Sequence, residues 1–182
     1  SVYASLYSVI SNCNFYLEKV DKIKAGIVDD GKLTSLDYYT GEVHTLRALA
    51  YSELLKLFCE AYDPATAKDK MGVVLRKSYS QAEESVRASL YDSYQFVLSD
   101  LAKAYELLDS DNDIYGNIYA TKAKAEALHA RVALYMQNWK DAVDYSTRLI
   151  DNKNFALSSV NQSISNGNHF QYLWTNDDGY EI

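Results

Sequence analysis

The chain has 182 residues, of which 48% are hydrophobic and 24% charged, an ordinary globular composition that is long enough for a sizeable core. Its net charge of -7 and its lack of clustered Lys and Arg argue against a nucleic-acid partner. The sequence contains neither a run of 18 apolar residues nor a basic region followed by an apolar stretch. We therefore expect neither a transmembrane helix nor a signal peptide within it.

Cysteine and tyrosine usage add two further expectations. Cys13 and Cys59 both lie in helical apolar patterns and are too few for a disulfide framework or a four-ligand zinc site, so we expect buried free thiols. The 17 tyrosines suit half-exposed helix faces or contacts with sugars. The single proline suits a helical protein.

Two long helices are expected in the first third of the chain. The first covers Val2–Lys24 and is followed by a polar loop over residues 27–37. The second covers residues 40–60 and ends before Asp63-Pro64. Its predicted inner face consists of Val43, Leu46, Ala50, Leu54, Leu57 and Phe58.

Residues 62–87 hold no helical period, and only the run MGVVL at residues 71–75 favours an extended segment. Long loops of this kind often carry function, so this is the most site-like part of the chain. A third helix begins at Ser89, where Asp92 completes a capping-box pattern.

Residues 121–151 predict two antiparallel helices. On the first, Ala123, Ala127, Ala130 and Leu134 share one face, whose small side chains favour close helix packing. Asn138 is expected to cap the second, with Asp141 three positions later. Its predicted buried stripe consists of Trp139, Ala142, Val143, Ser146, Leu149 and Ile150.

These elements predict an all-α fold of antiparallel helical hairpins with long irregular loops, in a single domain over residues 1–182. The spacing of Ala130, Trp139 and Ala142 matches the tetratricopeptide consensus, which favours an αα superhelix.

Two motifs invite a ligand but fit it poorly. Residues 26–34 spell G-x-x-x-x-G-K, yet Leu33 stands where a phosphate-binding loop has Ser or Thr, so a solvated loop is the better interpretation. Residues 109–116 resemble a calcium loop, but Ile114 replaces the turn glycine and Ala120 the bidentate glutamate. We expect a polar turn there and leave a weak calcium site open. No metal or catalytic residues are assigned, because the three histidines are scattered.

Flat aromatic rings beside planar polar groups are the features that bind sugars. The loop after the second helix offers Tyr62, Asp63, Arg76 and Tyr79, and Trp174 forms a second group near the C-terminus. The alternative is that these aromatic residues anchor their loops. For Arg47 and Arg131, which lie within apolar helices, we expect a structural role with a paired guanidinium.

Several blocks of the chain resemble the SusD/RagB-like outer-membrane nutrient-binding lipoproteins of Bacteroidetes. They are residues 41–62 with Leu-Arg-Ala at 46–48, MGVVL, the Asp100-Leu101 pair, and residues 121–151 with Ala130, Arg131, Leu134, Tyr135, Met136, Trp139 and Ala142. Two departures are Tyr119, where the family usually has arginine, and Gln137-Asn138, where it has Gly-Asp.

The resemblance implies a non-catalytic protein without a cofactor. Such proteins are surface lipoproteins of the outer membrane that capture oligosaccharides or other nutrients for a SusC-like TonB-dependent transporter. They are longer, with a lipid anchor and a C-terminal ligand-binding half that this chain does not include. A tetratricopeptide-like protein-protein interaction scaffold without a small ligand is the alternative, and an enzyme ranks third.

Overall fold

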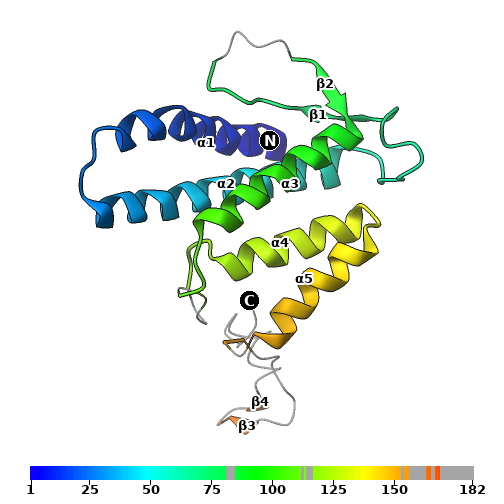
Figure 1. The fold of residues 1–182 in the computed structure, drawn as a ribbon. Helices are drawn as coiled ribbons and strands as arrows, with labels where there is room; N and C mark the ends of the chain where they lie inside the picture. Colours follow the sequence, from blue (N-terminus) through cyan, green and yellow to red (C-terminus); the bar gives the residue numbers. More distant parts are fainter. Residues whose placement is uncertain are drawn as a thin grey trace.

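The computed structural model describes residues 1–80, 85–111, 113, 117–152, 154–155, 163–164 and 167–168. Five helices dominate this part of the chain, as Figure 1 shows. They are α1 (Val2–Lys24), α2 (Asp30–Phe58), α3 (Leu90–Leu107), α4 (Lys122–Tyr135) and α5 (Trp139–Asp151). The short strands are β1 (Met71–Val74), β2 (Arg87–Ser89), β3 (Ser163–Ile164) and β4 (Gly167–Asn168). None of the described helices combines the length and apolar character needed to cross a membrane.

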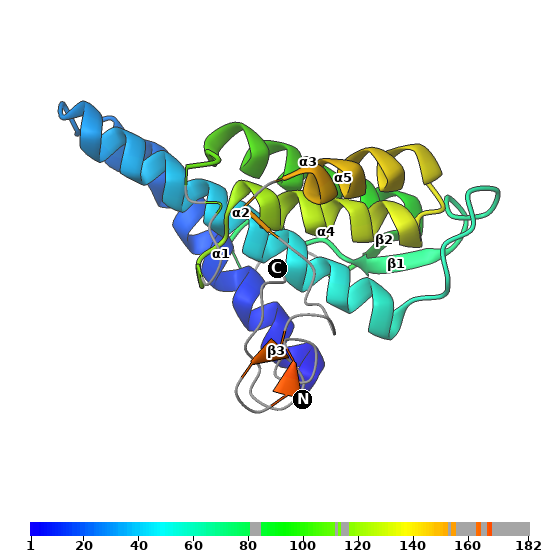
Figure 2. The same cartoon turned by 90° about the horizontal axis from the view of Figure 1, so that it is seen from below.

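Helices α1 and α2 form an antiparallel hairpin whose turn end projects beyond the other helices (Figures 1 and 2). The predicted loop over residues 27–37 is wrong from Asp30 onward, where α2 begins. Asp29 caps this helix, because its Oδ1 accepts a hydrogen bond of 2.8 Å from the Lys32 amide. The hydroxyls of Thr34 and Ser35 donate to carbonyls four residues earlier, so these polar residues are accommodated inside the helix.

The predicted inner face of α2 is also displaced. Leu46, Leu57 and Phe58 are exposed, whereas the buried face includes His44, Arg47 and Tyr51. A hydrophobicity pattern assigns charged residues to the solvent side. In this helix an arginine and a histidine are buried in an ion-pair network. The observed buried face is therefore rotated by about one residue from the predicted one.

Strands β1 and β2 form a small antiparallel ladder that leads into α3. A Cβ at Gly72 would lie 2.1 Å from the Ser93 Oγ and 2.5 Å from the Ser89 carbonyl oxygen, so only glycine fits there. The predicted extended segment at MGVVL is thus confirmed over Met71–Val74. The cap at the start of α3 is confirmed as well, because the Asp92 amide donates to the Ser89 Oγ at 3.0 Å.

The second hairpin, α4 and α5, turns at Gln137, whose φ of 58° is left-handed. Asn138 caps α5 as predicted, accepting a hydrogen bond from the Asp141 amide at 3.3 Å. Figure 1 shows this hairpin beneath the layer of α2 and α3, and α3 packs against α4.

The predicted faces of this hairpin are only partly correct. Ala123 and Ala130 are buried, but Leu134 is 55% exposed. The buried stripe predicted for α5 is wrong for the described chain, since none of its residues is buried. Trp139, Val143 and Ile150 lie 61%, 63% and 80% exposed. The apolar spacing therefore predicted the helix correctly but did not predict which of its residues are buried.

Cys13 and Cys59 are free thiols, as expected. Cys13 is buried, and this burial raises the pKa of its thiol to about 11. Cys59 is only partly buried. A thiol that stays protonated is unreactive, so Cys13 serves as a small core residue.

Candidate functional site

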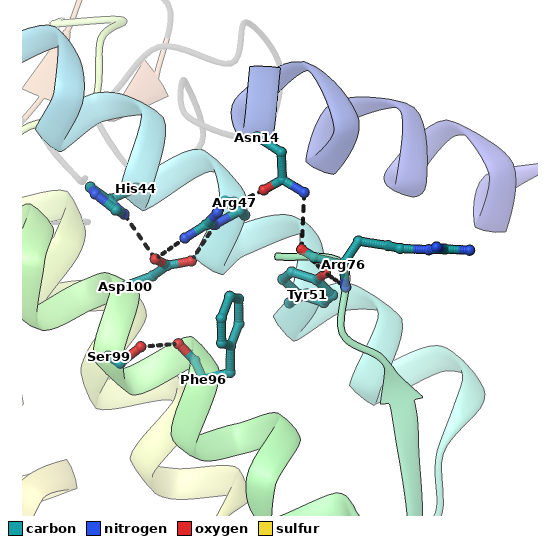
Figure 3. A network of polar contacts seen from close by, with 8 residues as sticks. All are labelled: Asn14, His44, Arg47, Tyr51, Arg76, Phe96, Ser99 and Asp100. Atoms are coloured by element: carbon teal, nitrogen blue, oxygen red, sulfur yellow. Dashed lines mark hydrogen bonds and ion pairs between the residues drawn. The ribbon is translucent and has the colours of Figure 1, made fainter. Parts of the chain in front are cut away.

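A buried polar network joins three helices behind the loop that follows β1, and Figure 3 shows its members. The Arg47 guanidinium on α2 donates to both oxygens of the Asp100 carboxylate on α3, at 2.8 and 2.7 Å. His44 Nδ1 lies 2.8 Å from the same carboxylate. Burial alone would raise the pKa of Asp100, but the hydrogen bonds from Arg47 and His44 outweigh it and lower this pKa. Asp100 is therefore ionised and fully paired.

Asn14 on α1 extends this network to residues 75–80, which we call the site loop. Its Oδ1 accepts a hydrogen bond of 2.7 Å from Arg47 Nη1. Its Nδ2 donates to the carbonyl oxygens of Arg76 and Ser78 at 2.9 and 3.0 Å. Tyr51 adds two more bonds, because its hydroxyl pairs with both the amide and the carbonyl of Arg76. The backbone at Arg76 is thus held by α1 and α2 together.

A cavity of about 500 Å³ lies between the N-terminal half of α1 and the site loop. Its described lining residues are Tyr3, Tyr7, Ser11, Asn14, Val74, Arg76, Ser78, Tyr79, Ser80 and Ser85. Aromatic rings and hydroxyl groups predominate, and Arg76 is the only charged residue among them. Such a volume is typical of a small-molecule site.

Neighbouring aromatic residues hold the tyrosine rings of the cavity in place. Tyr79 meets Phe15 edge-on, with ring centroids 5.0 Å apart, and its amide donates to a Glu18 carboxylate oxygen. Tyr3 packs edge-on against Phe58 at 5.1 Å. Tyr3 and Tyr79 are nevertheless 42% and 47% exposed, so each retains surface that a ligand can cover.

Tyr7 has a structural role at the base of the cavity. Its hydroxyl accepts a hydrogen bond from the Val74 amide at 3.1 Å and donates one to the Val74 carbonyl at 2.9 Å. Burial, together with the neighbouring Tyr3, raises the pKa of Tyr7, so the phenol stays protonated. The hydroxyl therefore joins α1 to the end of β1.

The structure brings together two of the five residues that the sequence suggested for ligand binding, Arg76 and Tyr79. Tyr62 does not line this cavity. It is buried, meets Tyr94 edge-on at 5.0 Å and accepts a hydrogen bond from Gln137 at its carbonyl, which fits the alternative of a loop anchor. Asp63 is exposed, and its Oδ1 accepts a hydrogen bond from the Ala65 amide. Trp174 lies outside the described residues.

Sequence reasoning missed the contribution of α1 to the cavity. Tyr3, Tyr7, Ser11 and Asn14 recur at steps of four and three, which places them on one helix face. The helix itself is predicted from its apolar residues, among them Val2, Leu6 and Val9, and not from this polar face. The recurrence of tyrosine, serine and asparagine on one helix face was the sequence signal that could have indicated this contribution.

The residues of the two weak motifs are used in capping and turns. Asp29 of the G-x-x-x-x-G-K segment caps α2, and Asp113 of the calcium-like segment accepts a hydrogen bond of 2.9 Å from the Ala123 amide at the start of α4. Asn112 and residues 114–116 lie outside the described residues. Within the described part of the chain, no three His, Cys, Asp or Glu side chains gather as a metal site would require.

Arg47 has the structural role expected from the sequence, and Arg131 differs. Arg131 remains 45% exposed and lies 3.8 Å from Glu53, a surface pair between α4 and α2. Such pairs contribute little to stability. Both guanidinium groups are therefore paired, as expected, but only the pair of Arg47 is buried.

The succession of antiparallel helices defines an all-α protein of tetratricopeptide-like hairpins, with a cavity of small-molecule size beside α1. A comparison with protein families then gives the particular family. The SusD-like family described as "starch-binding associating with outer membrane" matches residues 1–134. The chain belongs to this family.

Several solved structures share the fold of this chain. A SusD superfamily protein from Bacteroides thetaiotaomicron is 24% identical, with a TM-score of 0.79, and the match covers 98% of this chain and 36% of the other. A SusD-like protein from Bacteroides fragilis is 28% identical, with a TM-score of 0.72, and the match covers 100% of this chain and 32% of the other. A SusD-like carbohydrate-binding protein from Bacteroides vulgatus is 20% identical, with a TM-score of 0.72, and the match covers 87% of this chain and 32% of the other. The comparison with curated proteins found no match.

The chain therefore spans about a third of the length of these three relatives. The family's description names starch binding and an association with the outer membrane.

Proposed function

We propose that the protein binds oligosaccharides without chemical conversion, in the cavity between α1 and the site loop. The observation that supports this proposal is the set of lining groups. Two half-exposed tyrosine rings, at Tyr3 and Tyr79, flank serine hydroxyls and the Arg76 guanidinium. Rings stack on the apolar faces of sugars, while hydroxyls and a guanidinium match the hydroxyl groups.

The rigidity of the site supports the same proposal. The site loop is held at Arg76 and Ser78 by Asn14, and at Arg76 by Tyr51, before any ligand arrives. A site organised in advance loses less conformational entropy on binding. A modest set of contacts is then sufficient for specific binding.

A glycan array followed by titration calorimetry tests the proposal. We expect Tyr79→Ala to weaken binding of the best oligosaccharide by roughly tenfold or more, since a stacked aromatic ring contributes on the order of 1 kcal/mol or above. Tyr39→Ala is the matched control, because Tyr39 is a comparably exposed tyrosine on α2 outside this cavity. If Tyr79→Ala and Tyr39→Ala bind the oligosaccharide with equal affinity, the binding site lies outside this cavity.

We further propose that a lipid-anchored, surface-exposed form of the protein delivers its ligand to a SusC-like TonB-dependent transporter. The family's association with the outer membrane supports this step. Purification from the outer membrane of cells that express the protein should recover the transporter with it. Recovery of the protein alone, under conditions that preserve membrane complexes, would contradict the delivery step.

An interaction scaffold without a small ligand is the second candidate, and one observation favours it. A cavity of about 520 Å³ between α2 and α4 is lined largely by apolar groups, among them Leu46, Leu49 and Ile118. Ile118 is 85% exposed. If the protein binds no glycan yet co-purifies with a transporter, the scaffold function is the correct one.

A further inference from the structure

Two half-exposed tyrosine rings line the cavity at separate points along α1. Tyr3 belongs to the first turn of this helix, and its ring meets the ring of Tyr7 with centroids 4.8 Å apart. Tyr79 comes from the site loop, but its ring meets Phe15 at 5.0 Å and its amide donates to a Glu18 carboxylate oxygen. Tyr3 is therefore placed at the start of α1, and Tyr79 lies beyond the middle of the same helix.

The helix sets the distance between these two rings. Tyr3 and Phe15 are twelve residues apart, which corresponds to about 18 Å along the axis of an α-helix. Each tyrosine ring also packs edge-on against a phenylalanine: Tyr3 meets Phe58 of α2 at 5.1 Å, and Tyr79 meets Phe15. The spacing of the two rings is thus a property of the folded chain and is present before a ligand binds.

We infer that the cavity binds a linear oligosaccharide that runs along α1, with one sugar ring against Tyr3 and another, further along the sugar chain, against Tyr79. This inference rests on the proposed carbohydrate binding and specifies an extended chain of sugars as the ligand class. Stacked groups approach to about 3.5–4.0 Å between carbon atoms, so a single sugar ring cannot contact both tyrosines. Ser11 lines the cavity between them and places a hydroxyl along the path of the chain.

A series of sugars of increasing length tests this inference. Malto-, cello-, xylo- and manno-oligosaccharides are titrated by calorimetry, each from the monosaccharide to the hexasaccharide. We expect the affinity for at least one series to rise by about tenfold or more at the length that first reaches both rings, because a second stacking interaction is gained there. Beyond that length the affinity should change little.

Variants assign this step in affinity to the two rings. For the longest member of the series, Tyr3→Ala and Tyr79→Ala should each weaken binding about tenfold, and each should remove the step between short and long chains. Tyr39→Ala is the matched control, because Tyr39 is a comparably exposed tyrosine on α2 outside this cavity, and it should preserve the step. Circular dichroism and thermal unfolding confirm that the variants are folded.

The outcomes separate this inference from the proposed function. If short sugars bind as tightly as long ones, or if the step survives either tyrosine substitution in the cavity, the two-ring inference is wrong while carbohydrate binding stands. A long sugar chain that needs Tyr79 but not Tyr3 would reject the inference in the same way. If no glycan on the array and no sugar of any length binds, the proposed function fails together with the inference.

Discussion

Asp100 shows how a residue can be essential to the fold and yet be hard to assign from sequence. It is 1% exposed and receives hydrogen bonds from Arg47 and His44, which lie 53 and 56 residues away in the chain. The apolar helix around Arg47 predicted that its guanidinium would be paired. It could not indicate the partner, because pairing between helices depends on how they cross.

Replacing Asp100 by Asn should destabilise the protein by about 3–5 kcal/mol, because it leaves the buried Arg47 charge without its counter-charge. Urea unfolding measures the change. Asp144→Asn is the matched control, since Asp144 is in an exposed pair with Lys140 and should change stability by less than about 1 kcal/mol. Similar losses in both variants would mean that the buried network is not a main source of stability.

His129 gives a pH dependence with a defined sign. Its ring stacks on Tyr145 with centroids 3.8 Å apart, and its Nε2 lies 3.8 Å from an Asp141 carboxylate oxygen. Burial lowers the pKa of His129 below 6.5, and Arg148 acts in the same direction, while Asp141 opposes both. The unfolded chain thus binds a proton at His129 at a higher pH than the folded protein does.

The free energy of unfolding should therefore fall as the pH drops below about 6.5. His129→Phe, which keeps a ring to stack on Tyr145, should make this fall shallower than in the unmodified protein. Denaturant titrations from pH 5 to pH 8 give the two curves. Curves that remain parallel over this range would exclude His129 as a source of the pH dependence.

At the scale of elements, the sequence predicted the presence and order of the five helices and the caps at Ser89 and Asn138 correctly, but it placed the start of α2 too late in the chain. These features depend on local hydrogen bonds and on spacing within one segment. The buried faces of the helices were harder to predict, because burial depends on which other element packs against each helix. The buried Arg47 displaced the inner face of α2, and the apolar stripe of α5 is exposed in the described chain.

The site loop is the element on which the proposed function depends, and Asn14 holds it. Asn14→Ala should lower stability by about 1–3 kcal/mol, since it removes the partner of a buried Arg47 donor and one hydrogen bond to each of two loop carbonyls. It should also weaken glycan binding severalfold, because the loop loses two of the bonds that fix Arg76 and Ser78. Calorimetry and unfolding measure both effects.

Val132→Ala provides the comparison for Asn14→Ala. Val132 is 1% exposed on α4 and does not line the cavity, so this variant should lose stability by a similar amount without losing affinity. If the two variants lose affinity equally, the effect is one of general stability. If Asn14→Ala binds normally, the network does not position the loop.

For the whole molecule, the resemblance in motifs gave the family correctly, and the helical pattern gave the fold class. The site was only half accessible to the same reasoning. Arg76 and Tyr79 stood out because they lie in an irregular loop, but Tyr3 and Asn14 lie in a regular helix and approach that loop only in the folded chain. Long-range proximity of this kind is not recorded in local sequence patterns.

The central claim is that sugar binds between α1 and the site loop, and a crystal structure of the protein with the best oligosaccharide from the array tests it most directly. We predict a sugar ring against Tyr79 or Tyr3, with a polar group of the sugar within hydrogen-bonding distance of Arg76. An oligosaccharide bound at another surface, with this cavity holding only solvent, would contradict the claim.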